Sequence, residues 1–76
     1  MNTSDFVANF AAQFEETDPT VFCSETKFRD LEEWSSLIAL SVIAMVDEEY
    51  NIKLKGDDIR NSQTIEDIYK IVQSRM

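Results

Sequence analysis

The stretch "EEWSSLIALSVIAMVDEEY", Glu32 to Tyr50, decides the fold, because it contains the longest apolar run of the chain. Ten residues without a charge, 37–46, lie between a pair of serines and three consecutive acids. Wound at about 100° per residue, a helix from Ser36 to Asn51 separates two faces. One face is a core stripe of Ala39, Val42, Ile43, Val46 and Tyr50. The opposite face begins apolar and ends acidic, and we expect it to be solvated.

Two adjacent serines, Ser35 and Ser36, stand where this helix begins. A serine before an apolar helical run is an N-cap, whose hydroxyl accepts a hydrogen bond from an N–H of the first turn. Only one serine can hold that position, so the other hydroxyl is free at the positive end of the helix, where phosphate binds favourably. The chain has no histidine to activate a serine nucleophile. We therefore interpret the free hydroxyl as a point of attachment for chemistry performed by a second protein.

The N-terminal segment "SDFVANFAAQFEE", residues 4–16, spaces its phenylalanines and small apolar residues as an amphipathic helix does. Ser4 or Asp5 is expected to cap its start. Asp18-Pro19 is expected to end it, because the residue before a proline is disfavoured in helical conformation.

Residues 17–35 form a long connection without a sustained hydrophobic period. Phe28, Leu31 and Trp34 are spaced as in a loose helical turn, so they can anchor this connection over the end of a bundle. The sequence therefore predicts an ordered crossover between the first two helices.

Two further elements follow the second helix. Residues 57–61 fit one short helical turn after Gly56. The last segment, "TIEDIYKIVQSR", residues 64–75, has helical apolar spacing, and Thr64 with Asp67 matches a capping box. The sequence thus predicts an all-α fold, a small bundle of three main helices plus one short helix, with a long crossover between the first two.

Composition limits the protein classes that need be considered. With 76 residues, the chain has room for one hydrophobic core, so residues 1–76 are expected to form a single domain. Fifteen acids against seven basic residues give a net charge of -8, which disfavours nucleic acid and anionic lipid partners. No apolar run reaches the length of a membrane span, so we expect no membrane insertion and predict a cytoplasmic monomer.

The residue types present in the chain do not favour catalysis or metal binding. Cys23 is the single cysteine, and without histidine it lacks both the usual partner of a catalytic thiol and the commonest metal ligand. We interpret Cys23 as a small apolar residue of a loop. No catalytic residue and no metal site are predicted, and the chain is expected not to be an enzyme.

Four sequence features in this order resemble the acyl carrier protein family. They are the "F.DL" pattern at residues 28–31, Ser36-Leu37 at the start of the second helix, the acidic "DEEYNIKL" at its end, and the closing "TIEDIYKIV". The resemblance spans nearly the whole chain and runs without a gap from Ser36 to Val72. In that family the motif Asp-Ser-Leu carries 4'-phosphopantetheine on its serine through a phosphodiester.

The resemblance implies an acyl-carrier-like bundle with Ser36 as the attachment residue for 4'-phosphopantetheine, because only Ser36 is followed by leucine. Ser35 stands where the family usually has aspartate, and Trp34 replaces a small residue common in carriers of fatty acid synthesis. Trp34 is expected either to shape the rim around the arm or simply to pack the crossover onto the bundle. The terminal thiol of the arm would carry acyl intermediates as thioesters, and a phosphopantetheinyl transferase would attach the arm. The cargo pathway would be fatty acid, polyketide or specialised lipid biosynthesis.

The family also docks on its enzymes through the second helix, whose acids meet basic residues of the partner. Partners by this resemblance are acyl-transferring, acyl-activating or condensing enzymes with basic and apolar docking patches. The early positions of the second helix are apolar in this chain. We therefore expect partner enzymes to recognise it partly through hydrophobic contact, unless the crossover covers Ile38 and Leu40. An alternative role of the acids in the second helix is to keep the protein soluble. The predicted docking residues are Leu37, Ile38, Leu40, Ser41, Ala44, Asp47 and Glu48.

A different class of function fits the same fold and charge. An unmodified acidic helical adaptor would bind partners through the same face of the second helix. The two interpretations differ at Ser36, because an adaptor should tolerate Ser36→Ala and a carrier should lose all function.

Overall fold

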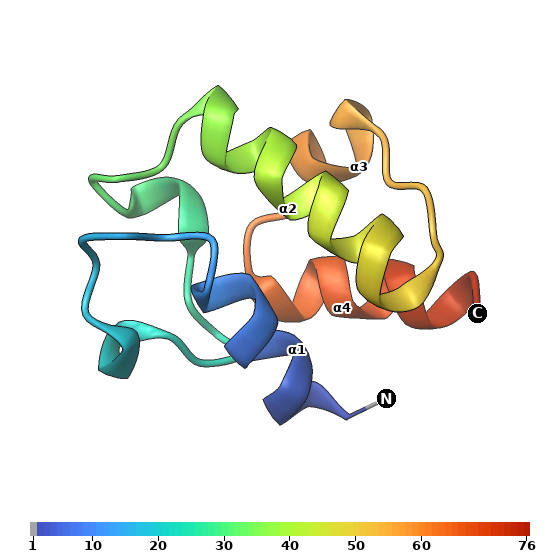
Figure 1. Cartoon of the computed structure of the whole chain (residues 1–76), viewed down its shortest axis with the longest axis horizontal. Helices are drawn as coiled ribbons and strands as arrows, with labels where there is room; N and C mark the ends of the chain where they lie inside the picture. Colours follow the sequence, from blue (N-terminus) through green and yellow to red (C-terminus); the bar gives the residue numbers. More distant parts are fainter. Residues whose placement is uncertain (1) are drawn as a thin grey trace.

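The computed structural model describes residues 2–76, and its regular elements are helical (Figure 1). Within residues 2–76 there is no strand, which confirms the predicted small all-α bundle. Two 3-10 turns, Pro19–Val21 and Phe28–Asp30, lie in the crossover. The four α-helices are α1 (Thr3–Ala11), α2 (Ser36–Tyr50), α3 (Gly56–Arg60) and α4 (Ile65–Ser74).

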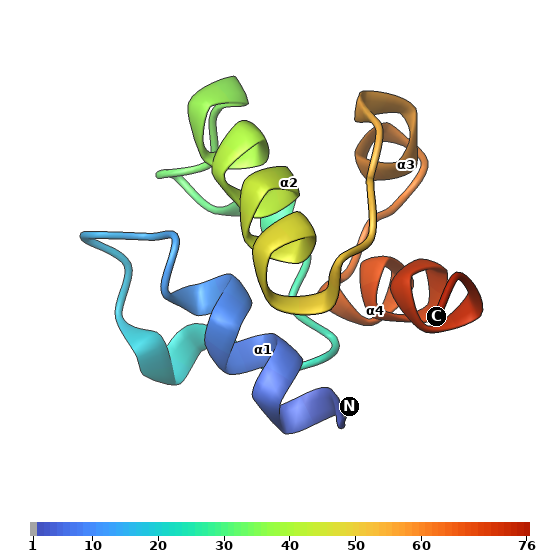
Figure 2. The same ribbon diagram turned by 45° about the vertical axis from the view of Figure 1, so that its right-hand side comes forward.

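Helix α2, with 15 residues, runs obliquely across the view of Figure 1. Helix α1 contacts both α2 and α4, and α3 contacts α4. Figure 2 shows α2 between the crossover on one side and the short α3 on the other. The described chain measures 30 × 23 × 20 Å along its principal axes. Among residues 2–76, no element covers the face of α2 on which Leu37 and Leu40 are exposed.

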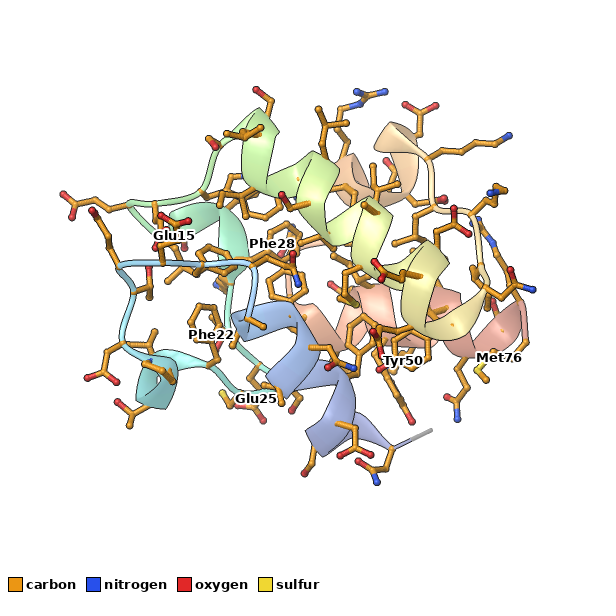
Figure 3. The ribbon with its side chains drawn as sticks, in the orientation of Figure 1. Glu15, Phe22, Glu25, Phe28, Tyr50 and Met76 are labelled. Carbon is orange, nitrogen blue, oxygen red and sulfur yellow. The ribbon has the colours of Figure 1, made fainter. Side chains whose placement is uncertain are left out.

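The core is rich in aromatic side chains. Phe6, Phe10 and Phe28 are fully buried, and Phe22 and Phe28 lie on the crossover side of the core (Figure 3). Ring centroids of Phe14 and Phe22 are 4.9 Å apart, which ties the crossover to the residues following α1. The crossover is therefore ordered by packed aromatic rings, as the spacing of its apolar residues predicted.

Both ends of α1 differ from the prediction. The N-cap is Asn2, whose side-chain oxygen accepts a hydrogen bond from Asp5 N at 2.8 Å, so Ser4 and Asp5 lie inside the helix. The helix also ends at Ala11, well before Asp18-Pro19. The expected N-cap and end were therefore wrong.

The early end of α1 has a physical cause in the crossover. The carboxylate of Glu33 accepts hydrogen bonds from the backbone N–H groups of Glu15, Glu16 and Thr17 at 2.7, 3.1 and 2.9 Å. It also accepts one from the Thr17 hydroxyl at 2.7 Å. These bonds satisfy N–H groups that a longer helix would have paired with its own carbonyls. They also lower the pKa of Glu33, with the Glu15 N–H bond as the largest cause.

The second half of the chain follows the prediction closely. Helix α2 ends at Tyr50, and its C-cap, Asn51, adopts the left-handed conformation (φ 58°) that asparagine tolerates at helix ends. Thr64 caps α4, accepting from Asp67 N, while Asp67 accepts from Thr64 N. This confirms the predicted capping box. The short helical turn occurs as α3, beginning one residue earlier than predicted, at Gly56.

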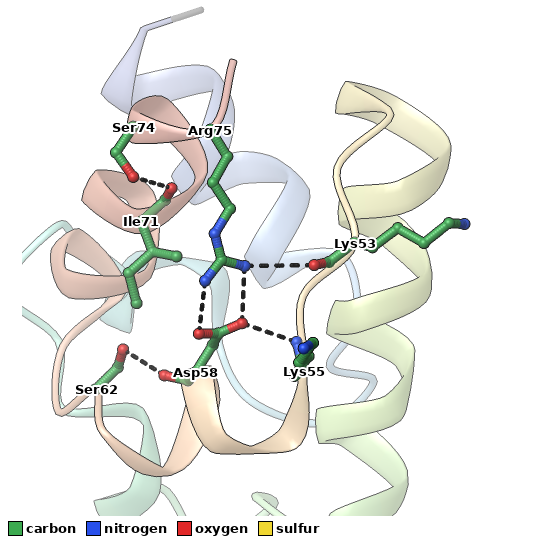
Figure 4. A network of polar contacts seen from close by, with 7 residues as sticks. All are labelled: Lys53, Lys55, Asp58, Ser62, Ile71, Ser74 and Arg75. Carbon is green, nitrogen blue, oxygen red and sulfur yellow. Dashed lines mark hydrogen bonds and ion pairs between the residues drawn. The ribbon is translucent and has the colours of Figure 1, made fainter.

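A polar network fixes α3 against the end of α4 (Figure 4). The guanidinium of Arg75 donates to both carboxylate oxygens of Asp58 at 2.9 Å, a paired geometry that favours a defined orientation. Lys55 N donates to the same carboxylate at 2.9 Å. The position of α3 matters because α3 forms one wall of the groove described below.

Candidate functional site

The two serines at the start of α2 have different structural roles. Ser35 is the N-cap, and its hydroxyl accepts a hydrogen bond from Ile38 N at 3.3 Å. Ser36 is the first residue of the helix and is exposed. Its hydroxyl has no hydrogen-bond partner among residues 2–76. The cap is therefore complete without Ser36, whose hydroxyl is available for attachment.

Ser36 borders a groove of about 350 Å³ between α2 and α3. The α2 wall is formed by Ala39, Leu40 and Ile43, which follow Ser36 at helical spacing. The other lining residues are Arg29, Trp34, Gly56, Ile59 and Arg60. Most of this lining is apolar, so the groove can accept a flexible, partly apolar chain attached at Ser36.

Trp34 contributes to the core and to the groove at once. Its ring centroid lies 4.7 Å from that of Phe28 and 6.4 Å from that of Phe10, so it packs the crossover onto the bundle. The same half-buried side chain lines the groove beside Ser36. The two expected roles of Trp34 are therefore compatible in this structure.

The exposed face of α2 starts with two large apolar side chains. Leu37 is 72% exposed and Leu40 is 63% exposed, so the crossover does not cover Leu40. Ala44 is exposed on the same helix, and Ser41 is half-buried. Ile38 differs from these, because it is half-buried and packs against the core cluster. Leu37, Leu40 and Ala44 thus form the apolar part of the predicted docking face.

Acids occupy the other end of this face. Asp47 forms an ion pair with Lys53 at 2.9 Å, with both side chains substantially exposed. Glu48 and Glu49 are exposed and form no ion pair with residues 2–76. No basic residue lies in the last turn of α2 to balance the three acids. Acids at this end oppose the helix dipole at a cost of about 0.3–1 kcal/mol each, which favours a role beyond stability.

Cys23 lies in the crossover, exposed to solvent. The Thr26 hydroxyl is 3.5 Å from its sulfur, and this hydrogen bond is the largest cause that lowers the pKa of the thiol. Cys23 is not among the residues lining the groove beside Ser36. Over the part of the chain that the structure describes, no group of three metal-ligating side chains is found.

Several residues of the groove had no signal in the sequence. Arg29 precedes the start of α2 by seven positions, and Arg60 belongs to a different helix, so no local spacing connects either of them to Ser36. Ile59 has an apolar side chain typical of any short helix. Only the packing of α3 beside α2 brings these residues together.

No protein-family model, no curated protein and no solved structure matches this chain. Within residues 2–76, no helix is both long enough and apolar enough to cross a bilayer.

Proposed function

We propose that this chain is an acyl carrier whose Ser36 bears a 4'-phosphopantetheine arm. The observation that carries this proposal is that the two serines at the start of α2 have different roles. Ser35 caps the helix, and the exposed hydroxyl of Ser36 lies unbonded beside an apolar groove. When attached, the arm supplies a thiol that carries acyl groups as thioesters. The chain itself performs no reaction in this proposal.

The residues around Ser36 suit an arm joined through a phosphodiester. The first turn of α2 presents backbone N–H groups, and its dipole favours a negative charge beside Ser36. Ser35 preserves the cap that holds this turn in place. The groove offers apolar surface beyond the attachment point.

The proposed attachment requires an external enzyme, a phosphopantetheinyl transferase. In this step Ser36 Oγ forms a bond to phosphorus and the pyrophosphate bond of coenzyme A breaks. Adenosine 3',5'-bisphosphate leaves, and the hydroxyl proton passes to a base on the transferase. A separate base is needed because a serine hydroxyl is a weak nucleophile by itself.

Partner enzymes would dock on the exposed face of α2. Leu37, Leu40 and Ala44 supply apolar contact, and Glu48 and Glu49 supply charge for basic residues of a partner. Asp47 is already paired with Lys53, so it contributes less free charge. This combination favours acyl-transferring, acyl-activating or condensing enzymes with a mixed basic and apolar docking patch.

Intact mass spectrometry tests this proposal. The purified chain is incubated with coenzyme A and a broad-specificity phosphopantetheinyl transferase, beside Ser36→Ala. We expect the native sequence to gain the mass of one phosphopantetheine and Ser36→Ala to gain nothing. Ser74→Ala is the matched control, because Ser74 is an exposed serine at the end of α4, and it should load normally.

If the native sequence is not loaded with phosphopantetheine, the variant Ser35→Asp separates two explanations. Loading restored by Ser35→Asp would show that the chosen transferase recognises the native sequence around Ser36 poorly. No loading in either sequence would contradict the carrier and favour the unmodified acidic adaptor, which uses the same face of α2.

A further inference from the structure

We propose that Arg29 and Arg60 form a binding site for the phosphodiester of the arm, at the edge of the groove beside Ser36. This inference rests on the proposed function, because the phosphate is the one attached to Ser36. It adds a charged anchor to a groove that is otherwise apolar.

The charge distribution of the chain sets this groove apart. The protein has 15 acids and seven basic residues, yet the groove is lined by two arginines and by no acid. The same groove includes Ser36. A phosphate bonded to Ser36 Oγ would thus enter a cationic neighbourhood on a strongly anionic protein. Arginine suits this role, because its planar guanidinium pairs with phosphate oxygens through two N–H groups.

Arg29 is positioned by neutral contacts. One of its terminal nitrogens donates to the carbonyl of Ser62, and its guanidinium carbon lies 5.9 Å from the ring centroid of Phe28. It makes no ion pair with any of residues 2–76. A guanidinium has five N–H donors, so most of those of Arg29 remain available. Arg29 is therefore a pre-oriented cation whose charge is not neutralised by a carboxylate.

Arg60 has one competing partner, Asp57, one turn earlier in α3. The two side chains are 71% and 74% exposed, and exposed ion pairs of this kind contribute little to stability. A phosphate fixed at Ser36 has the advantage of covalent attachment, so it can share Arg60 with Asp57.

Binding at this site would direct the arm into the groove at its root. The phosphate would be held at the arginines, and the chain beyond it would meet Trp34, Ile43 and Ile59. An arm held in this way lies beside α3 and away from the acids at the far end of α2. Because this binding occurs only in the folded chain, the modified chain should be more stable than the unmodified one.

A thermodynamic cycle tests this inference. Thermal unfolding midpoints are measured for the unmodified and modified forms of the native sequence, Arg29→Gln, Arg60→Gln and Lys70→Gln, with loading verified by intact mass. Each variant serves as its own reference, so any effect of the substitution on the fold itself cancels in the difference. Lys70 is an exposed cation of α4 that does not line the groove, and Lys70→Gln removes the same charge.

We expect modification to raise the midpoint of the native sequence and of Lys70→Gln by about 4 °C or more. In Arg29→Gln and Arg60→Gln the rise should be reduced or reversed, because an added negative charge destabilises an anionic protein when no cation receives it. Complete loading with an equal rise in all four sequences would overturn this inference alone. Absence of any loading, with Ser35→Asp included, would overturn the proposed function and this inference with it.

Discussion

At the scale of single residues, the start of α2 shows how neighbouring residues of one type can have separate roles. Ser35 has extended backbone geometry and completes the helix cap, whereas Ser36 lies within the helix with a free, exposed hydroxyl. Aspartate would be an equally good N-cap at position 35, because serine and aspartate side chains both offer an oxygen to the first turn. Ser35 therefore caps the helix without adding a charge at this position.

Removal of this cap should weaken the fold. We predict that Ser35→Ala lowers the free energy of unfolding by about 0.5–1 kcal/mol, the lower part of the usual range, because the bond to Ile38 N is exposed and 3.3 Å long. Ser35→Asp should be at least as stable as the native chain. Equilibrium unfolding in urea measures both variants. Equal stability of Ser35→Ala and the native chain would show that the cap has no energetic role.

At the scale of elements, the bundle depends on polar contacts that place short segments. Helix α3 has only five residues, too few to be stable alone, so its position depends on Asp58 and Arg75 and on the buried Ile59. The hydrogen bond from Arg75 is the largest cause that lowers the pKa of Asp58, followed by the bond from Lys55 N. The placement of α3, and hence of the groove wall, is therefore sensitive to acid.

The pH dependence of stability follows from the direction of this shift. The pKa of Asp58 is lower in the folded chain than the value of about 4 expected when unfolded. Its stabilising contribution is therefore complete above pH of about 4 and is lost as pH falls through the folded pKa. We predict that Asp58→Asn is less stable than the native chain at neutral pH and that the two converge in acid. Urea unfolding across pH 2–7 tests this, and a constant difference at every pH would contradict it.

The exposed face of α2 is expected to bind partners without stabilising the fold. We predict that Leu40→Ser changes the free energy of unfolding by less than about 0.5 kcal/mol, because Leu40 is 63% exposed. Its loading by the transferase should fall about tenfold in kcat/KM, because an apolar contact is lost on docking. Val21→Ser is the matched control, since Val21 is 47% exposed in the crossover, outside α2. Equal loading of both variants would contradict this docking role for Leu40.

At the scale of the whole molecule, aromatic packing compensates for a small core. A domain of 76 residues buries a modest fraction of its surface, so each large core side chain contributes a substantial part of the stability. Phe28 is fully buried and contacts Phe10 and Trp34, which joins α1 to the part of the crossover just before α2. The same ring lies beside Arg29, at the edge of the groove.

Truncation of Phe28 should therefore destabilise the protein strongly. We predict that Phe28→Ala lowers the free energy of unfolding by about 3–5 kcal/mol. A chain of this length is stable by about 4–11 kcal/mol in total, so the loss would be a large part of the stability. Circular dichroism during heating measures the loss, with the exposed Leu37→Ala as control. A midpoint within about 5 °C of the native value would contradict this role of Phe28.

Sequence reasoning predicted the elements well where local signals act, as in the apolar run of α2 and the capping box of Thr64 and Asp67. It was wrong at α1, because the carboxylate that satisfies the N–H groups beyond the helix belongs to Glu33, far along the chain. A carboxylate in an acidic segment has no local feature that reveals such a role.

The candidate site was predictable in part for the same reason. Ser36, Leu37 and Leu40 lie on one continuous helix, so winding the sequence was enough to separate the exposed face from the core stripe. The groove lined by Arg29 and Arg60 depends on tertiary packing. Contacts between elements of this kind have no periodicity in the sequence.

The carrier proposal is tested most directly by the state of Ser36 in the chain isolated from its native cell. Intact mass establishes whether one phosphopantetheine is present, and peptide fragmentation between Ser35 and Ser36 assigns it to a residue. We predict a single modification located on Ser36. An unmodified chain, or a modification on Ser35, would contradict the assignment of Ser36 as the attachment residue.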